Sequence, residues 1–144
     1  MKLVMSSETK SRGQAKSPEG SKPPDIRSRS FAYALRAIKL YQYLQGRKNG
    51  AGWILGNPYL RSACSVGANV KEAQAGESRA DFIHKLGIAQ KEARESLYWL
   101  SLLSESAIVR KKQLEPLMQE TKEITAIITT ILVKCKGRHG GQIS

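Results

Sequence analysis

The apolar residues of this chain recur with a helical period over most of its length. Between about Arg29 and Gln45 they form two stripes in which successive members are three or four residues apart. One stripe is Phe31, Leu35 and Ile38, and the other is Tyr33, Ala37, Leu40 and Leu44. This pattern predicts a first helix that is apolar on two sides.

A second helix is predicted from Asn57 to about Ala75. Asn57 can accept hydrogen bonds from free amides as an N-cap, and Pro58 fits the first helical position. The preceding segment, 46–56, holds four glycines and is expected to be a connection. Because Gly67 costs roughly 1 kcal/mol relative to Ala inside a helix, we expect a neighbouring helix to approach closely there.

Two longer helices complete the pattern. Ser78 is expected to cap a third helix that reaches about Ser104, with Asp81 near the positive end of the helix dipole. Apolar residues at alternating three and four spacing predict a fourth helix over about 111–136, which Gly137 then ends. Four amphipathic helices without a convincing strand predict an all-α fold, an up-down-up-down antiparallel four-helix bundle.

The tails differ from this predicted bundle in composition. Residues 1–30 are rich in Ser, Lys, Gly and Pro, a composition that predicts a disordered basic tail. Residues 31–136 are expected to form the bundle domain. Residues 137–144 are expected to form a flexible basic tail. No apolar run approaches the ~18 residues that a membrane span needs, and none resembles a signal-peptide core. We therefore expect a cytoplasmic protein that does not bind membranes.

The net charge of +12, from 24 basic and 12 acidic residues, favours a phosphate-rich partner such as RNA or DNA. The candidate phosphate contacts are basic residues on or just after the first helix and just before the fourth. They are Arg36, Lys39, Arg47, Lys48, Arg110, Lys111 and Lys112. In an antiparallel bundle the cations that follow the first helix and those that precede the fourth would converge on one end. Ordinary solvated cations would give the same sequence pattern.

The sequence does not indicate catalysis. Bundles with a carboxylate-bridged metal pair need Glu-x-x-His on two helices, and the two histidines, His84 and His139, do not supply it. Cys64 and Cys135 lie far apart without the spacing of a zinc site. No nucleophile, phosphate-cradling glycine motif or cofactor site stands out, so we expect no catalytic residues, no metal and no cofactor.

Ser65, Asn69 and Glu72 share one face of the second helix with Arg61, at spacings of four and three. One interpretation is a polar ligand site. The other is a hydrogen-bonded network that fixes helix packing, with Asp81 as part of the structural polar motif. The apolar end of the third helix, with Tyr98, Trp99 and Leu102, is interpreted as a subunit interface rather than a cofactor pocket.

The sequence resembles a known family over about residues 31–136. Its motifs are SVGANVKEA from Ser65, SRADFIHKL from Ser78, IAQKEARE from Ile88 and the following Tyr98-Trp99-Leu100. These motifs resemble the four-helix bundle proteins encoded in intervening sequences of bacterial 23S rRNA genes. Many relatives have a proline where Gly67 stands here.

The resemblance implies a homo-oligomer, a ring of five subunits, without enzymatic activity. It also implies an architecture similar to the accessory proteins of diversity-generating retroelements, which bind a reverse transcriptase and nucleic acid. Our leading hypothesis is a non-enzymatic homo-oligomer that binds nucleic acid, RNA more than DNA, through basic surfaces. The alternative is a scaffold that docks a partner protein such as a reverse transcriptase.

Overall fold

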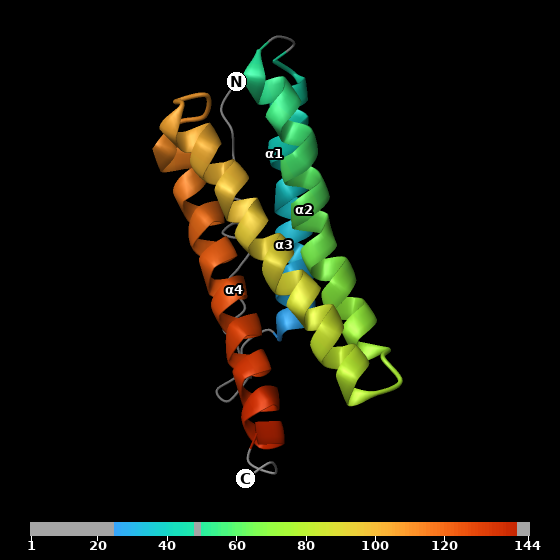
Figure 1. The fold of residues 1–144 in the computed structure, drawn as a ribbon. Helices are drawn as coiled ribbons and strands as arrows, with labels where there is room; N and C mark the ends of the chain where they lie inside the picture. Colours follow the sequence, from blue (N-terminus) through green and yellow to red (C-terminus); the bar gives the residue numbers. More distant parts are fainter. Residues whose placement is uncertain (1–24, 48–49, 141–144) are drawn as a thin grey trace, which may run out of the picture.

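The structure, a computed structural model, describes residues 25–47 and 50–140, and it contains four long helices (Figure 1). They are α1 (Ile26–Gln45), α2 (Ala51–Gln74), α3 (Arg79–Glu105) and α4 (Lys111–Gly140). Within these described segments there is no strand. The predicted all-α class is confirmed.

Successive helices run antiparallel, and each packs on the one before it (Figure 1). The closest packing joins α2 to α1 on one side and to α3 on the other, while α4 packs on α3 and returns to α1 over a shorter length. This closed order of neighbours is the up-down-up-down four-helix bundle that the sequence predicts.

The core is built from aliphatic side chains and alanines, which let the helices approach closely. On α1 the stripe of Tyr33, Ala37, Leu40 and Leu44 is buried, as that pattern predicts for one of its two stripes. An added Cβ at Gly67 would lie 3.2 Å from the backbone oxygen of Ser30 on α1. The expected close approach of a neighbouring helix at this glycine is therefore confirmed.

The second stripe of α1 is not part of the core. Phe31 is 68% exposed, Leu35 50% and Ile38 38%. Because a four-helix bundle buries one face of each helix, the second apolar face of α1 points to solvent in the single chain.

Two predicted helix starts are wrong. Helix α1 begins at Ile26 instead of about Arg29, because Asp25 caps it by accepting a hydrogen bond from the amide of Ser28 at 3.0 Å. Residues 25–30 thus belong to the bundle, and the rest of the expected N-terminal tail lies outside the described residues. Helix α2 begins at Ala51, six residues before Asn57.

Pro58 lies inside α2 instead of opening it. The helix continues upstream of this proline because it packs against α1 there. An added Cβ at Gly56 would lie 3.4 Å from the Tyr41 ring, and Gly52 is buried beside Leu44. Tertiary packing thus overrides the local signal for a helix start.

The remaining helix ends are mostly as predicted. Ser78 caps α3 through the amide of Asp81 at 3.1 Å, and α4 begins at Lys111. The prediction that Gly137 ends α4 is wrong, because the helix continues to Gly140. Residues 141–144 of the expected C-terminal tail lie outside the described residues.

Candidate nucleic-acid interface

One end of the bundle gathers exposed cations from two connections. The chain leaves α1 through Gly46 and Arg47, and it enters α4 through Arg110, Lys111 and Lys112, all of which are exposed. We call these four cations the basic pole. The antiparallel order brings the end of α1, the start of α2, the end of α3 and the start of α4 to this same end (Figure 1).

Contacts between the two connections show that they meet at the basic pole. A small pocket of about 270 Å³ is lined by residues of both, including Arg47 and Gly52 from one connection and Ala107 and Ile108 from the other. An added Cβ at Gly52 would lie 2.7 Å from Cγ2 of Ile108, which leaves no room for a side chain at this contact. Arg47 therefore lies near the segment that leads to Arg110, across this small pocket.

The local structure leaves the cations of the basic pole accessible. The guanidinium of Arg47 lies 4.9 Å from the centre of the Tyr43 ring, a cation–π contact that holds the side chain without neutralising its charge. Val109, by contrast, is buried and anchors the connection before α4. The nearest acids in sequence, Glu105 and Glu115, are exposed and leave a positive balance.

The structure does not bring Arg36 and Lys39 into this group. Arg36 is nine residues before the end of α1, which corresponds to about 13 Å of helix, and Lys39 is six residues before it. Arg36 is also partly buried, and its Nε has no hydrogen-bond partner. Lys48 lies outside the described residues.

The polar motif on α2 contacts its own helix more than its neighbours. The side-chain amide of Asn69 donates to the backbone oxygen of Ser65 at 2.8 Å, and Glu72 is exposed. Arg61 instead reaches α3, where it pairs with Glu95 at 3.1 Å and lies 3.6 Å from Glu92. The described contact of Asn69 thus stays within α2, while Arg61 on the same face joins α2 to α3.

Sequence reasoning missed a buried polar network that joins all four helices. Tyr33 Oη lies 2.7 Å from Thr121 Oγ1 and accepts from the hydroxyl of Tyr59 at 3.1 Å. Ser62 and Ser96 meet beside it, with their hydroxyls 2.9 Å apart. Burial raises the pKa of both tyrosines, so both stay neutral hydrogen-bonding groups.

Sequence reasoning also missed the ion pairs that join α1 to α4. Arg29 binds Glu120 with two nitrogens and Glu123 with one, and both carboxylates are on α4. Hydrogen bonds to Glu120 raise the pKa of Arg29, and those from Arg29 lower the pKa of Glu123. The helical spacing of Arg29 places it beside Tyr33, but one sequence cannot show which acid it meets.

The predicted subunit-interface residues on α3 differ in exposure. Tyr98 is 56% exposed, and its ring meets the ring of Trp99 edge to face, with centroids 5.1 Å apart. Trp99 packs against the core, and Leu102 is partly buried. Tyr98 and Leu102 therefore offer apolar surface on α3.

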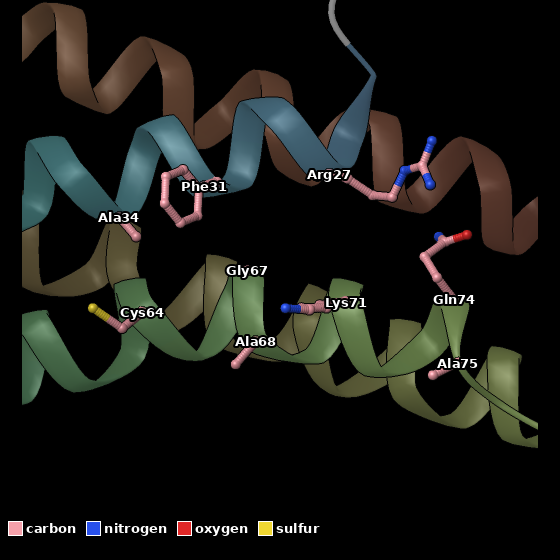
Figure 2. A pocket seen from close by; sticks show the side chains of 9 residues that line it. All are labelled: Arg27, Phe31, Ala34, Cys64, Gly67, Ala68, Lys71, Gln74 and Ala75. Carbon is pink, nitrogen blue, oxygen red and sulfur yellow. The ribbon is translucent and has the colours of Figure 1, made fainter.

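A larger apolar surface lies between α1 and α2, where a groove of about 680 Å³ runs along the two helices (Figure 2). Phe31 and Ala34 line it from α1, and small residues of α2 line the other side (Figure 2). Its lining residues are Arg27, Phe31, Ala34, Cys64, Gly67, Ala68, Lys71, Gln74 and Ala75. We call this the apolar groove, and none of its described lining residues is acidic.

The described part of the chain shows few features of a metal site or of a reactive nucleophile. No group of three or more His, Cys, Asp or Glu side chains there could hold a metal ion. Burial raises the pKa of Cys64, which lowers the fraction of reactive thiolate. None of the described helices is long and apolar enough to cross a membrane.

Comparison with known proteins places the chain in a family. Residues 24–130 match the family model of the 23S rRNA-intervening sequence protein. No curated protein matches the chain. A crystal structure of a protein of unknown function from the S23 ribosomal protein family of Bacteroides thetaiotaomicron is 36% identical, with a TM-score of 0.71. The match covers 75% of this chain and 98% of that one. On these matches, the chain belongs to the 23S rRNA-intervening sequence protein family.

Proposed function

We propose that this protein is a non-enzymatic homo-oligomer that binds structured RNA through its basic pole. The observation that carries the proposal is the convergence of Arg47 with Arg110, Lys111 and Lys112, from connections about 60 residues apart in sequence, on one end of the bundle. Clustered exposed cations bind phosphates and release the counterions that surround a nucleic acid. Because structured RNA is the proposed ligand, the proposal also places the protein in the cytoplasm.

The oligomer strengthens this proposal through geometry. A cyclic assembly with parallel bundles would repeat the basic pole around one end, and a ring of five would present five copies of it. The net charge of +12 per chain supports a long-range attraction to RNA. Folded RNA, which brings several phosphates close together, fits such an annulus better than a short single strand does.

A charge-removal experiment tests the basic pole. The variant carries Gln at Arg110, Lys111 and Lys112, and a matched control carries Gln at the exposed Lys91, Lys122 and Lys134. Both lose three charges, so overall attraction falls equally. We expect the pole variant to lose about 100-fold in RNA affinity at 0.1 M salt, and the control less than tenfold. The salt dependence of binding should also fall by about three counterions in the pole variant.

Equal losses in the two variants would contradict a defined site at the pole, and salt-insensitive binding would contradict the phosphate contacts. Ultraviolet crosslinking in the native cell, with denaturing purification and sequencing of the attached nucleic acid, then identifies the target. Enrichment of one defined RNA is the expected result. Background reads despite good recovery would contradict the proposal.

A protein-docking scaffold is the second candidate function, and the apolar groove favours it. A groove lined by Phe31 and by small residues of α2 fits an apolar segment of another protein, such as a reverse transcriptase. This candidate predicts that the charge-removal variants keep their cellular function, whereas substitutions in the groove abolish it.

A further inference from the structure

An exposed tryptophan lies at the same end of the bundle as the basic pole. Trp53 is two residues after the start of α2, and it is 47% exposed. The other tryptophan, Trp99, packs against the core. Among the exposed aromatic residues of the described segments, Phe31 is 14 residues before the end of α1 and Tyr98 is seven residues before the end of α3. Trp53 is therefore the exposed aromatic residue that lies nearest to this end.

Trp53 lies beside a cation of the basic pole. Trp53 and Arg47 line the same small pocket of about 270 Å³, so an aromatic and a cationic residue meet at one cavity. The side-chain amide of Gln45 donates to the backbone oxygen of Trp53 at 3.1 Å, which ties the start of α2 to the end of α1. The adjacent Gly52 is buried. These contacts order the backbone that carries Trp53 before a ligand arrives, which lowers the entropic cost of binding.

The surroundings of this pocket favour an anionic ligand. No Asp or Glu occurs between Ile26 and Lys71, a stretch that contains all of α1 and the first 21 residues of α2. None of the residues that line the pocket is acidic, and the exposed Glu105 at the end of α3 is not among them. An anionic group held by Arg47 therefore meets no carboxylate of the pocket lining.

The pairing of an exposed indole with a guanidinium matches the chemistry of a nucleotide. A nucleotide has a flat base, which stacks on aromatic side chains, and a phosphate, which binds cations. In a paired stem each base is stacked between its neighbours and its faces are covered. Proteins therefore stack side chains on the bases of loops, bulges and ends, which are free of a partner.

We propose that Trp53 stacks on one unpaired base of the bound RNA, while Arg47 holds a phosphate beside that base. This inference rests on the proposed function, and it narrows the ligand to an RNA with an unpaired base in a bulge or loop next to a stem. The other cations of the basic pole then contact phosphates of the stem. Those contacts supply affinity without distinguishing a bulged stem from a fully paired one.

The first test measures the affinity for two RNA hairpins that share one stem, of which one carries a single unpaired base. The variants are Trp53→Ala, Trp53→Phe and, as a control, Ile54→Ala at the neighbouring position, which is 61% exposed. We expect the wild type to prefer the bulged hairpin. Trp53→Ala should weaken binding of the bulged hairpin by about 5- to 150-fold, the range for one base–aromatic stack, and of the paired hairpin by less than about twofold. Trp53→Phe and Ile54→Ala should keep most of the preference.

The preference is a ratio of two affinities of the same protein. A loss of folded protein or a change of oligomer mass lowers both affinities and leaves the ratio unchanged. Equal affinities of the wild type for the two hairpins, or an unchanged preference in Trp53→Ala, would overturn the inference. An equal loss of preference in Ile54→Ala would also overturn it, in favour of a general apolar contact surface.

Tryptophan fluorescence then reports the stacking directly, because a base stacked on an indole quenches its emission. Trp99 is present in both the wild type and Trp53→Phe, so the difference between them isolates Trp53. We expect the bulged hairpin to quench the wild type and to leave Trp53→Phe unquenched. Equal quenching in both would overturn the inference. Salt-sensitive binding of both hairpins without quenching would sink this inference and leave the proposed function standing, whereas failure to bind either hairpin would sink both.

Discussion

The two ends of α1 differ in what holds them. Near its start, Asp25 caps the helix, Arg29 binds two carboxylates of α4, and Tyr33 meets Thr121 of α4 through its hydroxyl. Near its end, the chain turns through Gly46, and Arg47 rests on an aromatic ring beside a small pocket. The first end is fixed by polar contacts between helices, and the second presents its charge to solvent.

This difference separates stability from recognition. A cation paired with carboxylates in the bundle is not available to phosphate, whereas a cation held by a ring keeps its charge. We therefore expect the contacts made by the first half of α1 to contribute much of the free energy that stabilises the packing of α1 on α4. The basic pole can then vary its charges at small cost to the fold, and substitutions at matched positions test this contrast.

The largest expected effect concerns two arginines two helical turns apart on α1. Arg29→Met leaves Glu120, whose side chain is only 19% exposed, without its bidentate partner. Breaking a fully buried ion pair costs about 3 to 5 kcal/mol, and partial exposure reduces this to about 2 kcal/mol. Arg36→Met removes a partly buried guanidinium whose Nε is unsatisfied, and it should change the free energy of unfolding by less than about 0.5 kcal/mol.

Urea denaturation of both variants measures the difference directly. A combined Arg29→Met and Glu120→Leu variant serves as the control, because it removes the unpaired carboxylate and should recover part of the loss. Equal destabilisation by the two single arginine substitutions would contradict the contrast between the ends of α1.

The sequence carries more information about the helices than about their polar contacts. Apolar spacing located all four helices, and Ser78 located the start of α3 correctly, because a cap and a stripe are local features. The start of α2 was missed, since packing of Gly52 and Gly56 against α1 outweighs the local signal at Pro58. The sequence could not show which of the two stripes of α1 faces the core, because both have the same helical spacing.

A second contrast uses two helical glycines. An added Cβ at Gly52 would lie 2.7 Å from Cγ2 of Ile108, so Gly52→Ala must displace the Ile108 side chain or the connection that carries it. We expect a loss of about 1 to 2 kcal/mol in the free energy of unfolding. Gly87 in α3 has nothing within 4 Å of an added Cβ, and Gly87→Ala should stabilise by about 0.5 to 1 kcal/mol. Thermal denaturation should therefore shift the two midpoints in opposite directions, and shifts of the same sign would contradict the packing at the pole.

The position of the candidate site could be predicted in part, because it depends on the order of the helices along the chain. Antiparallel order alone places Arg47 and Arg110 at one end, so their convergence could be expected from the sequence. The partial burial of Arg36 could not, because it depends on how α1 lies in the bundle. The pairing of Arg29 with Glu120 joins residues 91 apart in sequence, and helical spacing on either helix does not encode it.

The smallest expected effect comes from a comparison of two helix starts, of which one has a side-chain cap and the other has none. Asp25 caps α1 with its carboxylate, whereas α2 begins after Gly50 without a side-chain cap. The hydrogen bond from the Ser28 amide lowers the pKa of Asp25 below 3.8, its ordinary value. The carboxylate therefore stabilises the folded state above that value, and this contribution is lost as the pH falls through the lowered pKa. The start of α1 should loosen in acid, while the start of α2 should not respond through its cap.

Amide chemical shifts measured by nuclear magnetic resonance between pH 6 and about pH 2 can follow this local change. The Ser28 amide should titrate with a midpoint below 3.8, and the Ala51 amide should not follow that midpoint. Asp25→Asn keeps a capping oxygen but has no proton to gain, so it should abolish the Ser28 transition. A Ser28 transition that persists in Asp25→Asn would assign the acid response to another group, such as Glu123, whose pKa is also lowered.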